Sequence, residues 1–300
     1  MTGFDSFKAL LAYCAENNVP VYQAALDYET ARSDYTESQV LEKMETILHQ
    51  MRLTVQEGID SETLSLSGLS GGDAKRVLAF SAANPDRSFL SALEINMIAF
   101  GLATLEENSR MKKIVACPTA GGSGSVPAAL LAVELEKNLS PEITVRGLLT
   151  ASLIGEITAR RLFLSGSAAG CQAEVGVASG MAAAGLAEMM AGSPQQVVNA
   201  AAISMQNLMG LVCDPVAGLV EVPCVLRNGL SGVQAGAAAT MALADVRSFI
   251  PLDEVVEAMA AVGKLMHPSL KETAAGGLAK TPTAVSFTEK FLKKATVQKV

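Results

Sequence analysis

Residues 172–209, QAEVGVASGMAAAGLAEMMAGSPQQVVNAAAISMQNLM, have the composition of two buried helices separated by a short turn. Alanine, glycine and medium-sized apolar side chains fill both halves, and such small side chains let helices pack closely. Ser193-Pro194 stands between the halves, where serine is a favoured N-cap and proline fits the first helical turn. The segment therefore predicts a helix over 172–191 and a second helix over 194–209.

Helical signals continue on both sides of this segment. Residues 5–17 place apolar side chains at i, i+3, i+4 and i+7, which is one face of a helix. The sequence Thr36-Glu37-Ser38-Gln39 has the form of a capping box, and the helix that it opens is expected to stop near Gly58. Further helices are expected over 88–108, 127–137, 141–164, 229–246 and 253–266. Because no segment alternates polar and apolar residues over a convincing length, we predict a mainly α protein, a compact multi-helix domain with Gly-rich loops.

Composition and charge exclude several classes of protein. The chain has 300 residues, a net charge of −7 and 4% aromatic residues, so a nucleic-acid partner is not expected. Glu188 and Asp214 bound the longest charge-free interval, but polar residues interrupt it and we expect no membrane span. The amino-acid composition changes near residue 110, after which Gly and Ala dominate. We interpret residues 1–300 as one domain, with a helical N-terminal subdomain over 1–110 as the alternative.

Five cysteines and two histidines, His49 and His267, limit the chemistry. The first residues carry acids and amides where a secretory leader would be apolar, and the cysteine count is odd. We therefore expect reduced thiols and a cytoplasmic location. Cys14 lies on an apolar helix face and is expected to be a buried hydrophobic residue. Cys117 opens a Gly-rich loop and is a further potential ligand.

Cys171, Cys213 and Cys224 lie beside glycine or proline in segments that break regular structure. Three or four thiolates from such loops are compatible with structural zinc, an iron–sulfur cluster, a redox pair, or incidental burial. The closely spaced cysteine pairs typical of zinc sites and of ferredoxins are absent from the sequence. A cluster held by only three cysteines would leave one iron open to act as a Lewis acid.

The Gly-rich loop Thr119-Ala120-Gly121-Gly122-Ser123-Gly124-Ser125 precedes an expected helix. Backbone amides at the start of a helix are suited to an anion such as a carboxylate. The alternative interpretation is a flexible connector with a helix cap. The loop is not a nucleotide P-loop, because no Gly-Lys-Ser/Thr follows it.

Several long strings occur together and in order: GLSGGDAKR (68–76), ACPTAGGSGSVPAAL (116–130), SGSAAGCQAEVGVASGMAAAGLAE (165–188), MGLVCDPVAGLVEVPCVLRN (209–228) and KETAAGGLAKTPT (271–283). Together they resemble the α chain of the bacterial iron–sulfur L-serine dehydratases of the two-subunit type. The resemblance covers essentially the whole chain. It implies conversion of L-serine to pyruvate and ammonia, a reaction of amino-acid degradation that feeds gluconeogenesis.

The resemblance also implies the cofactor and its ligands. Cys171, Cys213 and Cys224 match the family's ligands of a 4Fe-4S cluster, with the expected spacings of 42 and 11 positions, whereas Cys117 matches a position that is not a ligand. Pyridoxal phosphate is not required. The open iron would bind the hydroxyl and carboxylate of serine. The expected architecture is therefore a helical domain whose Gly-rich loops converge on a cluster site.

Residues around the cysteines are candidates for substrate contacts. With the resemblance, recognition of the substrate by the Gly-rich loop becomes the preferred interpretation. Ser165 and Ser167 either bond to the cluster or substrate or cap a helix, and Lys271 is an expected pocket residue. Arg227 would offset the charge of the thiolates, while the carboxylates of Glu174, Asp214 and Glu221 are expected to accept backbone or arginine hydrogen bonds. The candidate catalytic residues are Thr119, Ser123, Ser125, Ser165, Ser167 and Lys271.

No general base is evident in the sequence. The family's companion β chain carries a Ser-Ser-His-Thr string that does not occur here, so we expect a hetero-oligomer in which a β subunit completes the site. Two alternatives remain open. One is a related lyase acting on another β-substituted amino acid, such as L-cysteine. The other is a non-catalytic iron–sulfur sensor subunit.

Overall fold

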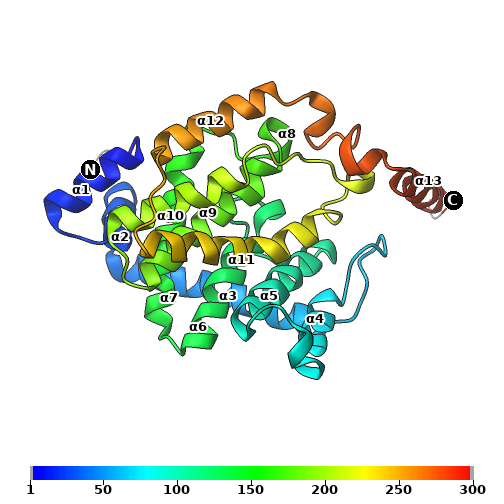
Figure 1. Cartoon of the computed structure of the whole chain (residues 1–300), viewed down its shortest axis with the longest axis horizontal. Coiled ribbons are helices and arrows are strands. Elements are labelled where there is room, and N and C mark those ends of the chain that lie inside the picture. The colour runs from blue at the N-terminus through cyan, green and yellow to red at the C-terminus, as the bar shows by residue number, and fades with distance from the viewer. Residues whose placement is uncertain (1–2, 298–300) are drawn as a thin grey trace.

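Helices dominate residues 3–297, which the computed structural model describes, and no β-strand occurs in that range (Figure 1). The mainly α prediction is confirmed. No helix of the described part is long and apolar enough to cross a bilayer. The α-helices are α1 (Phe7–Asn17), α2 (Val21–Arg32), α3 (Glu37–Asp60), α4 (Asp73–Ala83), α5 (Ala92–Ser109), α6 (Ser125–Lys137), α7 (Pro141–Ala159), α8 (Gly166–Ala169), α9 (Val177–Met189), α10 (Pro194–Asn207), α11 (Cys224–Leu243), α12 (Leu252–Leu265) and α13 (Pro282–Val297). Shorter turns are η1 (Pro85–Arg87), η2 (Ala120–Gly122), η3 (Gln172–Gly176), η4 (Val216–Gly218), η5 (Pro268–Leu270) and η6 (Gly277–Lys280).

Most expected helices occur within a few residues of their predicted bounds. The capping box at Thr36 and Gln39 is confirmed, and Ser193 caps α10 as expected. Two boundaries differ in a way that matters for the site. The expected helix over 172–191 begins with one π-helical turn, η3, before α9 starts at Val177. Helix α11 begins at Cys224, five residues earlier than expected, with Pro223 at its N-cap position.

Helix α9 forms the centre of the fold (Figure 1). Every residue from Val177 to Met189 is buried, and α9 packs against α6, α7, α10 and α11. Glycine is needed where α7 crosses α9, because a Cβ atom on Gly185 would lie 2.8 Å from the carbonyl oxygen of Gly147. The small side chains of the sequence therefore do permit close helix contacts, and the helices before residue 110 join the same packing, with α3 against α5 and α7. This packing favours one domain over 1–300, which stays a prediction.

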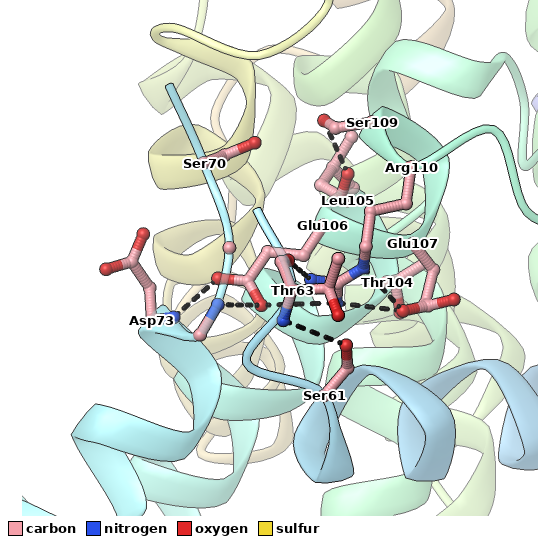
Figure 2. Close-up of polar contacts among 12 residues, drawn as sticks. Ser61, Thr63, Ser70, Asp73, Thr104, Leu105, Glu106, Glu107, Ser109 and Arg110 are labelled. Atoms are coloured by element: carbon pink, nitrogen blue, oxygen red, sulfur yellow. Dashed lines mark hydrogen bonds and ion pairs between the residues drawn. The ribbon is translucent and has the colours of Figure 1, made fainter. Parts of the chain in front are cut away.

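Three helices receive their N-terminal caps from carboxylates far away in the sequence. Glu188 of α9 accepts from the amide of Tyr22 at the start of α2, at 3.2 Å. Asp253 of α12 accepts from the first two amides of α1. Glu106 of α5 is fully buried and accepts from the amides of Gly72 and Asp73, at 3.1 and 2.6 Å, where α4 begins (Figure 2). These carboxylates compensate the positive helix ends and fix the N-terminal helices to the core.

Candidate active site

Three cysteines from separate parts of the chain meet beside η3. Cys171 immediately precedes η3, Cys213 lies in the connection between α10 and η4, and Cys224 is the first residue of α11. All three are buried, and none of them forms a disulfide bond. Cys213 and Cys171 share a thiol hydrogen bond, and the charge of Cys171 acts on Cys224. The structure thus brings together the three thiols that the sequence singled out.

The thiols differ in how readily they ionise. The hydrogen bond from Cys213, with help from the Arg227 guanidinium, lowers the pKa of Cys171 below its usual range. The same bond raises the pKa of Cys213. Burial raises the pKa of Cys224 to about 12. Without a metal, the arrangement therefore favours one thiolate, at Cys171, stabilised by a neighbouring donor and a cation.

Arg227 is held against the cysteines by the segment around Cys213. Its Nη1 donates to the carbonyl of Val212 at 2.8 Å, and its Nη2 donates to Asp214 Oδ1 at 2.9 Å. Arg227 also donates a hydrogen bond to the Cys171 thiol. Burial opposes the charged form of Arg227, but the negative charges of Cys171 and Asp214 outweigh this effect and raise its pKa. Asp214 is thus an arginine partner, as expected from the sequence. Arg227 is placed to offset negative charge on the sulfurs.

A second chain segment runs alongside Cys213. The Cys213 amide donates to the carbonyl of Leu270 at 2.8 Å, and the Glu272 amide donates to the carbonyl of Cys213 at 2.7 Å. Lys271 is thereby placed beside the cysteine site. Gly277 has a φ of +55° and packs directly on the carboxylate of Asp214, so a side chain there would collide with it. The KETAAGG string is therefore part of the wall around the cysteines.

The Gly-rich loop, which contains η2, packs against η3 and α11 at the site. Thr119 Oγ1 donates to Glu174 Oε1 at 2.7 Å. Asn228 of α11 fastens the loop, because its Nδ2 donates to the carbonyl of Gly121 at 2.7 Å and its Oδ1 accepts from the amide of Gly124 at 2.9 Å. The sequence reasoning missed Asn228. Its position one helical turn after Cys224 was the available signal.

The four predicted serines lie in two different settings. Ser123 is buried and donates to the carbonyl of Ala120 at 2.7 Å, and Ser125 is buried and shares a 2.7 Å hydrogen bond with Ser231. Ser165 accepts from the amide of Ala168 and so caps α8, with Ser167 at 3.0 Å from it. The hydroxyls of Ser123 and Ser125 are therefore engaged within the fold, whereas Ser165 and Ser167 are exposed.

The remaining two cysteines lie apart from this group. The Cys117 thiol contacts the backbone carbonyls of Val115 and Ser123, and burial raises its pKa to about 12. Cys14 lies on the buried face of α1 in the main core, where burial raises its pKa to about 11. Neither thiol is among the charges that act on Cys171, Cys213 or Cys224.

Three buried thiols, the usual ligand type of iron–sulfur clusters, form the donor set at this site. Among the side chains of residues 3–293, no three Cys, His, Asp or Glu surround one point closely enough to hold one metal ion. Buried thiols next to a fixed guanidinium meet the chemical requirement for cluster ligands.

The fold and the site together define an all-helical protein with a buried three-cysteine centre beside a Gly-rich loop. A family model described as "Serine dehydratase alpha chain" matches residues 16–279, and the chain belongs to this family. The chain is 42% identical to the Bacillus subtilis protein named "Probable L-serine dehydratase, alpha chain". The match covers 96% of this chain and 95% of that protein. The chain is 37% identical to "L-serine dehydratase, alpha chain" of Peptoniphilus asaccharolyticus, in a match that covers 96% of this chain and 98% of that protein. A longer relative is "L-serine dehydratase 1" of Escherichia coli, to which the chain is 37% identical over 282 residues. The match covers 61% of that relative.

Proposed function

We propose that this chain is the α subunit of an L-serine dehydratase that converts L-serine to pyruvate and ammonia. The names of its relatives support the reaction. The observation that carries the proposal in the structure is the meeting of Cys171, Cys213 and Cys224, which are far apart in the sequence, in one buried site. Deamination of serine requires loss of the Cα proton and of the β-hydroxyl, which is a poor leaving group in water.

We assign Cys171, Cys213 and Cys224 as the ligands of a 4Fe-4S cluster, and no pyridoxal phosphate is needed. When bound, such a cluster supplies a Lewis-acidic iron that stabilises the departing hydroxide. Arg227 contributes a fixed positive charge next to Cys171. The Gly-rich loop, held in place by Asn228, contributes backbone amides and Thr119 to the binding of the substrate. Lys271 lies in the wall next to Cys213, where a cation favours the substrate carboxylate.

A second polypeptide is part of the proposal. His49 is exposed on α3, and His267 shares a 2.8 Å hydrogen bond with Ser269 in an exposed turn. Neither histidine is among the charged groups that act on the three cysteines. A β subunit therefore supplies the proton acceptor, and the functional unit is a cytoplasmic hetero-oligomer. The hydroxyls of Ser165 and Ser167 are further candidates for contacts at this subunit boundary, because both are exposed.

An anaerobic assay with and without the β subunit tests the proposal. The chain is purified, reconstituted with iron and sulfide, and supplied with L-serine while pyruvate and ammonia are measured. We expect turnover only when both chains are present. Full turnover by this chain alone would contradict the role of the β subunit. Sulfide release from L-cysteine without any pyruvate from L-serine would overturn the assigned reaction.

A further inference from the structure

The carboxylate of Glu174 lies at the cysteine site without a cationic partner. Glu174 belongs to η3, three residues after Cys171, and its charge acts on Cys171, Cys213 and Cys224. The sequence led us to expect a backbone or arginine donor for this carboxylate. The structure instead gives it one hydrogen bond, from Thr119 Oγ1 to Oε1 at 2.7 Å.

The charge on Glu174 is not balanced within the described chain. No ion pair to Glu174 is formed by any side chain of residues 3–293. Burial raises the pKa of the Glu174 carboxyl, and the neighbouring negative charge of Glu272 raises it further. A carboxylate that is largely removed from water is costly unless it is paired. The site is therefore electrostatically suited to a cation that comes from outside the chain.

One oxygen of this carboxylate is free to bind a ligand. Oε2 accepts no hydrogen bond from residues 3–293, and it is not among the fully buried atoms that lack a partner, so solvent can reach it. The other buried carboxylates near the site are satisfied inside the chain. Asp214 binds Arg227 and the Leu278 amide, and Glu221 accepts from two serine hydroxyls.

Two glycines keep space open around Glu174. A Cβ atom on Gly121 would lie 2.9 Å from both carboxylate oxygens. A Cβ atom on Gly166 would lie 2.8 Å from Glu174 Oε2 and 2.7 Å from Cys213 Sγ. The carboxylate and the Cys213 sulfur therefore face the same small volume, which any side chain at position 166 would fill.

We infer that Glu174 binds the α-ammonium group of the amino acid substrate. The inference rests on the proposed function, which makes the ligand a small α-amino acid with an ammonium, a carboxylate and a hydroxyl group. The ammonium group needs a hydrogen-bond acceptor with negative charge, and Glu174 Oε2 supplies one beside the cysteines. Glu174 is in this way a specificity-determining residue that selects amino acids over hydroxy acids of the same shape.

The test compares two ligands in wild type and in Glu174→Gln. Glutamine keeps the size of the side chain and an acceptor for Thr119 but removes the charge. Binding to the reconstituted two-chain enzyme is followed through the absorbance and electron paramagnetic resonance of the iron, independently of turnover. The ligands are L-serine and 3-hydroxypropanoate, which lacks only the ammonium group. Glu221→Gln is the matched control, because that carboxylate bonds within the chain, to Ser65 and Ser70.

We expect Glu174→Gln to weaken L-serine binding about 10- to 100-fold, the usual effect of losing one charge-assisted hydrogen bond. Binding of 3-hydroxypropanoate should stay unchanged, KM for L-serine should rise and kcat should fall much less. Equal weakening of both ligands, or a fall in kcat with an unchanged KM, would overturn the inference, and the second result would assign Glu174 to proton transfer instead. If Glu174→Gln does not bind iron, Glu174→Asp allows the same comparison. Aspartate keeps the negative charge, but its side chain is one methylene shorter, so the carboxylate lies further from the ammonium group. A wild-type enzyme that forms no pyruvate from L-serine contradicts the proposed function rather than this assignment.

Discussion

Asn228 fastens the Gly-rich loop to α11, and its removal is expected to destabilise the fold substantially. The side chain is fully buried and bonds to the carbonyl of Gly121 and the amide of Gly124, both of which are buried as well. Asn228→Ala leaves these two backbone groups without partners. Each such group costs about 1–3 kcal/mol, so the free energy of unfolding should fall by roughly 2–6 kcal/mol. Total stabilities are about 5–15 kcal/mol, and the loss is therefore a large share.

Asn199 provides a matched control. Its amide group also bonds to two backbone groups of a loop, donating to the carbonyl of Val246 and accepting from the amide of Ser248, both at 2.6 Å. Val246 is exposed and Ser248 is partly exposed, so water can replace the lost bonds. Asn199→Ala should therefore cost less, about 1–2 kcal/mol.

Urea unfolding of both variants, followed by circular dichroism, measures these differences. Hydrogen exchange then localises them: residues 119–125 should exchange faster in Asn228→Ala and at the wild-type rate in Asn199→Ala. A loss below about 1 kcal/mol in Asn228→Ala, with unchanged exchange in the loop, would refute the role assigned to this side chain.

Two further predictions concern the helical core and its buried acids. Gly185→Ala should lower the free energy of unfolding by about 1–3 kcal/mol in thermal or urea unfolding, because its Cβ meets the backbone of Gly147. Gly236→Ala meets only the flexible end of Met97 and should be neutral or stabilising, so equal losses in the two variants would argue against this account of the α7–α9 crossing. Burial raises the pKa of Glu188, so the folded state holds its proton more tightly than the unfolded state, and this contribution to stability is lost as the pH rises above about 4.5. Glu188→Gln should therefore gain stability relative to wild type between pH 5 and pH 8, and a constant difference across that range would contradict the assignment.

The sequence predicted those helices whose start signals are local. Thr36 and Ser193 cap α3 and α10 with their own hydroxyls, and both helices were expected. Helices α2 and α4 were missed. They begin after Pro20 and Gly72, which provide no side-chain cap, and their caps come from Glu188 and Glu106, which only the tertiary structure brings near. The C-terminal helix α13 was missed as well; it packs against η4 and η6 at one end of the molecule (Figure 1).

The sequence likewise predicted one part of the candidate site, and the other part depends on contacts between distant segments. Thiol chemistry and the resemblance to a family identified Cys171, Cys213 and Cys224 before their positions were known. The parallel pairing of Cys213 with Lys271, and the space that Gly166 leaves between Cys213 and Glu174, depend on how α8, α11 and η3 pack. Local sequence patterns carry no information about such contacts between distant segments.

Iron content measured on anaerobically reconstituted cysteine variants tests the central assignment most directly. Wild type should hold about four irons per site. Single replacements of Cys171, Cys213 or Cys224 by alanine should abolish the iron and its absorbance. Cys117→Ala, a change in an equally buried thiol that lies apart from these three, should keep both. Loss of iron from Cys117→Ala alone, or full iron in any of the other three variants, would contradict the account.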